Sequence, residues 1–217
     1  MNIEIEVPES LNEITLKQYQ EYEKINTEEN KDTNFLLHKT VEIFCKLNLK
    51  DIITIRVNSI KVVINEINRV FASKTDFIPT FKLKGIEYGF IPKLDDISLG
   101  EYIDLDDNFS DWDKIHKAMA VLYRPITYKK KDKYLIEDYT GLDNAEVYKD
   151  MPLDVVLGAM VFFYRLSDEL LETTLNYLKR EQPRQINTEV LAALEKNGDG
   201  CSLFMDSVRG MLPVSIL

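Results

Sequence analysis

Apolar residues recur with the spacing of a helix along most of the chain. The clearest case is the segment 152–180, where one stripe repeats at steps of three, four and seven residues. The stripe comprises Leu153, Leu157, Met160, Tyr164, Leu171, Leu175 and Leu178. Up to Phe163 the segment is apolar on nearly every side, whereas polar residues fill its other faces from Ser167 onward. This pattern predicts one long central helix that is buried at its start and half-exposed at its end.

Shorter stretches predict further helices and a few strands. The helical stretches are Leu16–Ile25, Asn34–Leu47, Asn58–Phe71, Trp112–Tyr123, Asp143–Lys149, Asn187–Lys196 and Cys201–Met211. The run Ile52–Ile55 suits either a strand or a helix. The segment 80–91 alternates around Gly85, which is typical of a β-hairpin. Because a lone hairpin is marginally stable in water, we expect the alternating segment 2–7 to add a third strand.

The predicted fold class is therefore α+β, mainly α. We expect a single mainly helical domain over residues 1–217, with the long central helix at 152–180 and a small antiparallel sheet from 2–7 and 80–91. A chain of 217 residues with 45% hydrophobic residues can bury a sizeable core. No long low-complexity linker divides it.

Two helix starts share one sequence pattern. Thr15 and Ser98 stand where a hydroxyl caps a helix, and Gln18 and Glu101 follow three residues later, so we predict two capping boxes. Apolar residues flank each cap with the spacing of a hydrophobic staple. The staple pairs are Ile14 with Tyr19 and Ile97 with Tyr102. Either an internal repeat of strand, proline and capped helix or two independent helix starts explains the pattern, and neither carries chemistry.

Charge and cysteine content narrow the function classes. The net charge of −10 argues against a surface that neutralises nucleic-acid phosphates or anionic lipids. The segment 1–7 alternates Ile with Glu and lacks the apolar region of a signal peptide, and the longest uncharged run is too short to span a bilayer. Cys45 and Cys201 lie far apart in apolar contexts, so we expect free thiols and a reducing cytoplasm.

Several groups of residues invite a chemical interpretation, but a structural one explains each better. The segment Glu195–Asp206 resembles a calcium loop, yet it lacks the Asp at position one and the Glu at position twelve. His38 and His116 have no Cys or His partner at metal-ligand spacing. Lys129–Lys133 is most simply a solvated turn. An acidic cluster that could hold a divalent cation is better explained by helix capping and a solvated face. It comprises Asp95, Asp96, Glu101, Asp104, Asp106 and Asp107.

Three segments resemble proteins of tailed bacteriophages that infect Bacteroidetes. They are Gly89–Leu105 (GFIPKLDDISLGEYIDL), Ala118–Ile126 (AMAVLYRPI) and Leu157–Phe163 (LGAMVFF), and together with the start Ile14–Tyr19 (ITLKQY) they span most of the chain in the same order. The resemblance implies a phage morphogenesis protein: a virion component of the neck or tail, or a tail-assembly chaperone. It supplies no catalytic, cofactor-binding or metal-binding residues. It implies other phage structural proteins as partners in a larger assembly, within the virion or the host cytoplasm.

Three classes of function therefore remain open: a structural subunit of the virion, a transient chaperone that leaves the particle, and a metal-dependent enzyme that uses the acidic cluster. The chain end Cys201–Leu217 is unusually apolar. Chain ends usually fray unless something holds them, and exposed apolar patches usually mark contacts. We expect this segment to dock on a partner subunit or to pack on its own domain.

Overall fold

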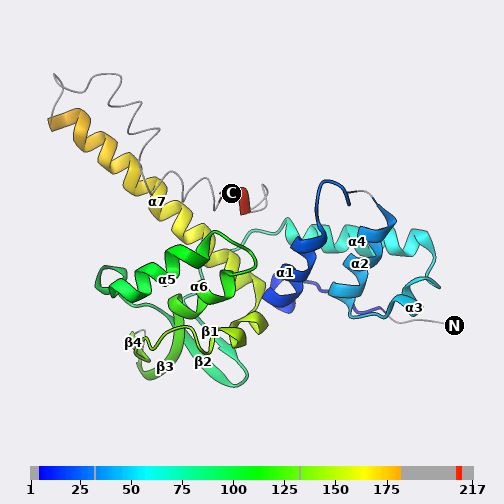
Figure 1. Cartoon of the computed structure of the whole chain (residues 1–217), viewed down its shortest axis with the longest axis horizontal. Helices are drawn as coiled ribbons and strands as arrows, with labels where there is room; N and C mark the ends of the chain where they lie inside the picture. Colours follow the sequence, from blue (N-terminus) through cyan, green and yellow to red (C-terminus); the bar gives the residue numbers. More distant parts are fainter. Residues whose placement is uncertain (1–4, 32, 132, 182–208, 212–217) are drawn as a thin grey trace.

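The fold of the computed structural model is α+β and mainly α, as predicted (Figure 1). The structure describes residues 5–31, 33–131, 133–181 and 209–211. In chain order the elements are η1 (Leu11–Glu13), α1 (Leu16–Ile25), α2 (Asn34–Cys45), α3 (Leu49–Ile52), α4 (Val57–Phe71), β1 (Thr80–Leu83), β2 (Ile86–Phe90), η2 (Leu94–Asp96), α5 (Leu99–Phe109), α6 (Ile115–Leu122), β3 (Tyr123–Lys130), β4 (Lys133–Ile136), η3 (Ala145–Asp150) and α7 (Leu153–Glu181), where η denotes a short 3₁₀ helix.

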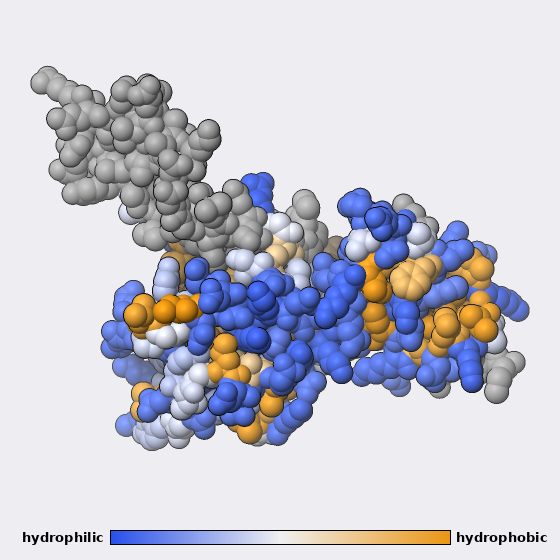
Figure 2. All heavy atoms as spheres, in the orientation of Figure 1, coloured by the Kyte–Doolittle hydropathy of each residue, from blue (hydrophilic) through white to orange (hydrophobic). Residues whose placement is uncertain are grey.

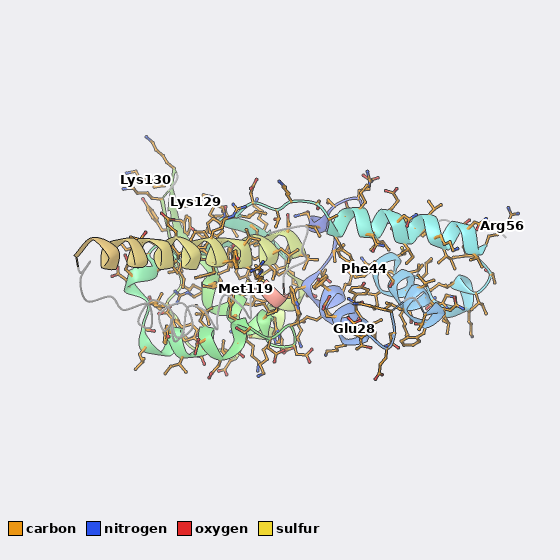
Figure 3. All side chains as sticks on the ribbon, turned by 90° about the horizontal axis from the view of Figure 1, so that it is seen from above. Glu28, Phe44, Arg56, Met119, Lys129 and Lys130 are labelled. Atoms are coloured by element: carbon orange, nitrogen blue, oxygen red, sulfur yellow. The ribbon has the colours of Figure 1, made fainter. Side chains whose placement is uncertain are left out.

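Helices α1–α4 form one lobe, called here the helical lobe (Figure 1). One face of α4 is buried at the spacing that the sequence shows, through Ile60, Val63, Ile67 and Val70. An aromatic cluster joins α1, α2 and α4: the rings of Phe44 and Phe71 lie 5.2 Å apart and those of Tyr22 and Phe44 5.4 Å apart. The first pair is edge-to-face and the second is tilted, and edge-to-face aromatic pairs add to the energy of apolar burial. Figure 3 shows Phe44 pointing into this lobe.

Both predicted capping boxes are present. The Thr15 hydroxyl accepts from the backbone N–H of Gln18, and the Gln18 side chain accepts in turn from the N–H of Thr15. Ser98 and Glu101 make the same reciprocal pair at the start of α5. The two staples differ, because Ile14 and Tyr19 are both buried whereas Tyr102 is 55% exposed.

The sheet has four antiparallel strands in the order β1-β2-β3-β4. The predicted hairpin is confirmed: Lys84 and Gly85 both have positive φ, 50° and 84°, as a two-residue hairpin turn of type I′ requires. Strand β2 then pairs with β3 through Tyr88 opposite Pro125. Together with α5, α6, η3 and the first half of α7, the sheet forms a second lobe, called here the sheet lobe (Figure 1).

The expectation of a strand at 2–7 is wrong for residues 5–7, which form no strand, and residues 2–4 lie outside the described residues. Ile5 and Val7 pack against the core as half-buried side chains instead. The strands that complete the sheet are 123–130 and 133–136 instead. Strand β3 begins at the residue that directly follows α6. The predicted solvated turn at Lys129–Lys133 is the exposed end of a second hairpin, in which Lys131 is a turn residue and the strands extend to Lys130 and from Lys133.

The start of α7 is buried as expected, with Val155 and Val156 fully enclosed. Two backbone hydrogen bonds connect this start to the N-terminal segment: Leu16 N–H donates to Met151 O (2.8 Å), and Leu153 N–H donates to Ile14 O (2.9 Å). Further along, α7 projects away from the sheet lobe (Figure 1). The buried apolar side chains of both lobes form one cluster.

Several expectations fall outside the described residues. The helices Asn187–Lys196 and Cys201–Met211, the loop Glu195–Asp206 and Cys201 lie there, apart from residues 209–211, which are helical. Met211 packs against the core cluster. The expectation of one domain over residues 1–217 and that of a docking C-terminal segment both stay predictions.

Candidate functional site

A buried ion pair joins helix α5 to strand β3 within the sheet lobe. Nη2 of Arg124, at the start of β3, lies 2.7 Å from Oε1 of Glu101 in α5, and only 12% and 8% of the two side chains are exposed. Burial by itself raises the pKa of Glu101, but hydrogen bonds from Ser98 and the charge of Arg124 outweigh it and leave the pKa lowered. The capping carboxylate is therefore held ionised.

A tyrosine extends this network to the loop after β4. The Arg124 guanidinium carbon lies 5.8 Å from the ring centre of Tyr139, and the Tyr139 hydroxyl donates to Asp104. Beside them is a cavity of about 200 Å³ that Tyr88 and Tyr148 also line. Burial, followed by the hydrogen bond to Asp104, raises the pKa of Tyr139.

This network holds elements of the sheet lobe together. Arg124 balances the charge of Glu101, and the network connects α5, β3 and the loop after β4. Nε of Arg124 is buried without a hydrogen-bond partner among the described residues. The pKa values of Tyr139 and Tyr148, which line the cavity, are raised and favour the neutral forms of both side chains.

The structure separates the acidic cluster that the sequence suggested. Glu101 pairs with Arg124 and Asp104 accepts from Tyr139, whereas Asp96 pairs with Lys93. The other members are exposed: Asp95, Asp106 and Asp107. Among the described residues, no three His, Cys, Asp or Glu side chains converge as a metal site.

Both histidines lie in structural settings. His38 is half-buried on α2. His116 on α6 is 3% exposed, and its Nδ1 lies 3.3 Å from Nε2 of Gln20, whose amide donates to the neutral ring. Burial, and next the charge of Lys149, lower the pKa of His116 despite the nearby Glu146. The remaining thiol in the described part, Cys45, is buried, which raises its pKa to about 11.

Exposed apolar side chains mark the helical lobe more clearly than any polar group. Leu49, Ile53 and Val57 lie in and around the turn between α3 and α4, and are 50%, 66% and 67% exposed. Figure 2 shows hydrophobic residues gathered at this far end of the lobe. These three residues are called the tip surface below.

The turn that carries the tip surface is held by its own backbone. Ile53 N–H donates to Leu49 O (3.1 Å), and Ile60 N–H donates to Arg56 O (3.1 Å). Ile52 is completely buried and anchors the turn from inside. The exposed residues are therefore displayed on an ordered scaffold.

Sequence patterns alone missed both features. Arg124 followed by Pro125 indicated only the end of a helix, and nothing local connects Arg124 to Glu101. The ambiguous run Ile52–Ile55 was a signal for one residue of the tip surface, Ile53, which directly follows the four-residue helix α3.

Of the described residues, none belongs to a helix long and apolar enough to cross a membrane. No family model, curated protein sequence or solved structure matches the chain.

Proposed function

We propose that the protein is a non-enzymatic structural or assembly protein of a tailed bacteriophage, which acts through contacts with other phage structural proteins in the neck, tail or particle. The segments Gly89–Leu105, Ala118–Ile126 and Leu157–Phe163, which resemble phage morphogenesis proteins, support the phage setting. The tip surface supports the mode of action, and it is the observation that carries the proposal.

The tip surface has the chemistry of a protein contact. Full burial of a large apolar side chain stabilises by about 1.5–3 kcal/mol, so covering the exposed parts of three such residues contributes about 3–5 kcal/mol. Large apolar anchors held on an ordered scaffold are typical centres of interfaces. They lie at the end of the helical lobe, where hydrophobic residues gather on the surface (Figure 2).

Mass spectrometry of purified phage particles tests the role. A structural subunit remains in the particle at a fixed copy number. The alternative, a transient tail-assembly chaperone, is required for assembly but absent from the finished particle. Normal particles made by a phage that lacks the protein would refute both.

Surface variants test the mode of action. Replacing Ile53 and Val57 together by Ser should leave the melting temperature nearly unchanged and abolish co-purification of phage proteins. Ile86→Ser is the matched control, because Ile86 is 49% exposed but lies in the hairpin of the sheet lobe. Equal co-purification by both variants would show that the tip surface is not the contact.

A metal-dependent enzyme that uses the acidic cluster is the less favoured alternative. It needs carboxylates that converge on one ion, whereas Asp104 bonds to Tyr139 and Asp106 is exposed on α5. Titration with Mg²⁺ or Ca²⁺ tests it. Binding that is lost when Asp104, Asp106 and Asp107 are replaced by Ala would favour the enzyme.

A further inference from the structure

One face of the β3–β4 hairpin combines positive charge with exposed apolar side chains. Tyr128 stands opposite Leu135 and Lys130 stands opposite Lys133, so all four side chains lie on the same face of the hairpin. Tyr128 and Leu135 are 57% and 61% exposed. Like charges directly opposite each other across two strands are unfavourable. This face is called the basic face below.

The lysines of the basic face have no ion-pair partner among the residues that the structure describes. Neighbouring Lys129, which points to the other side of the hairpin, pairs with Glu87. Figure 3 shows Lys129 and Lys130 extending away from the body of the molecule. An acidic surface on another molecule would relieve the repulsion between Lys130 and Lys133.

The outer side of α5 combines negative charge with exposed apolar side chains. Leu99, Ile103 and Asp106 follow at steps of four and three residues and so lie on one side of the helix, with Leu99 75% and Ile103 48% exposed. Tyr102 borders them and is 55% exposed. This side lies opposite the buried Glu101 and is called the acidic face below.

The charges of the acidic face are also unfavourably placed for an isolated helix. Asp106 and Asp107 lie in the last turn of α5, where no basic residue stands and where the helix dipole disfavours negative charge. Neither makes an ion pair with a described residue. A cation from outside would therefore stabilise this end of α5.

We propose that the basic face of one copy of this chain docks on the acidic face of a second copy. Tyr128 and Leu135 would cover Leu99 and Ile103, while Lys130 and Lys133 would approach the carboxylates at the end of α5. Each face supplies the charge that the other lacks, and each exposes the apolar area that such a contact buries. This contact joins copies of the chain and does not depend on the phage role proposed above.

The proposed contact is head-to-tail. In Figure 3 the labelled lysines project from one edge of the sheet lobe, and the green ribbon of α5 and α6 lies along the other edge. The two faces therefore cannot meet within one copy, and each bound copy still offers one free face of each kind. Such contacts build rings or open filaments instead of closed two-fold dimers.

Light scattering coupled to size-exclusion chromatography tests the proposal on the full chain. At about 0.1 mM protein, where weak contacts become populated, the average mass should exceed that of one copy in low salt. It should fall toward one copy as salt rises from about 0.05 M to about 0.5 M, because salt screens exposed charges. A single-copy mass at low salt overturns the proposal.

Charge reversal makes the test specific. The hairpin variant, Lys130→Glu with Lys133→Glu, and the helix variant, Asp106→Lys with Asp107→Lys, should each have the mass of one copy. Mixed at equal amounts they should associate again, because the intact basic face of the helix variant meets the intact acidic face of the hairpin variant, and the two reversed faces also match each other. Lys50→Glu with Lys61→Glu, the same charge change on the helical lobe, is the control and should associate like the wild type.

Circular dichroism of each variant verifies its fold before the masses are compared. Loss of association in the hairpin variant alone, with an unaffected helix variant, would show that the acidic face is not the partner. Failure of the two folded variants to associate on mixing would equally overturn the head-to-tail contact.

Discussion

Gly158 and Gly100 allow one substitution to be tested in two helices with opposite expected outcomes. Gly158 lies in the buried first half of α7, where a methyl group would overlap the carbonyl oxygen of Asp76 and lie 3.2 Å from its carbonyl carbon. Gly100 lies in the first turn of α5, and a methyl group there would meet nothing within 4 Å. Neither glycine has a positive φ, so the backbone itself accepts alanine at both positions.

Two effects oppose each other at Gly158. Alanine in a helix interior is favoured over glycine by about 1 kcal/mol. Forcing an extra methyl into a packed core costs about 1–3 kcal/mol, and the upper part of that range applies because a backbone carbonyl cannot rotate away. We therefore expect Gly158→Ala to destabilise by about 1–2 kcal/mol, after the helix preference is subtracted.

At Gly100 only the favourable effect acts, so Gly100→Ala should stabilise by about 0.5 kcal/mol. For a chain of this size, about 1 kcal/mol shifts the melting temperature by about 2–4 °C. Thermal melts should thus show a decrease of about 2–8 °C for Gly158→Ala and a small increase for Gly100→Ala. An increase for both would refute the close approach of α7 to Asp76.

Three further predictions concern caps, core and pH. Thr15→Ala and Ser98→Ala should each lower the free energy of unfolding in urea by about 1 kcal/mol, the usual loss for a hydroxyl cap, and wild-type stability in both would refute the capping boxes. Phe163→Ala should cost about 3–5 kcal/mol because the ring packs 5.2 Å from that of Phe109. Its control, the exposed Glu169→Ala, should stay within about 0.5 kcal/mol, and similar effects of both would place Phe163 outside the core. The pKa of His116 is lowered in the folded protein, so the neutral ring stabilises the fold fully above the unfolded pKa of about 6.5. As the pH falls below that value, the free energy of unfolding decreases by at most about 1.4 kcal/mol per pH unit. Urea melts between pH 7.5 and pH 5.5 should therefore show a weaker pH dependence for His116→Gln than for the wild type, and equal slopes would contradict this assignment.

Local chemistry explains what the sequence predicts well here. The caps at Thr15 and Ser98 need only residues three positions away, and the first hairpin needs only the turn at Gly85. Helices such as α4 are recognisable because the apolar residues of their buried side recur at helical spacing within one short segment.

Pairing between distant segments explains what the sequence does not predict. Pro125 looks like a break because it lacks an N–H, yet in β3 its carbonyl accepts from Glu137 (2.9 Å) and the strand continues. The exposure of Tyr102 depends on where α5 meets the sheet lobe, so a correct staple pattern does not bury it. The tip surface, the basic face and the acidic face are likewise defined by what remains uncovered after packing.

The two hydrogen bonds between the N-terminal segment and the start of α7 also constrain how the chain matures during synthesis. The carbonyl oxygen of Ile14 accepts from Leu153 and the N–H of Leu16 donates to Met151, two partners that lie more than a hundred residues later in the chain. A ribosome releases residues in order, so α1 emerges early but cannot complete these contacts until residue 153 has left the exit tunnel. Such sequence-distant contacts also slow folding, because a long loop must close before they form. The aromatic side of α1 can pack early against α2 and α4, but the chain before it stays without its α7 partners while most of the protein is made, which makes this segment of the nascent chain prone to aggregation.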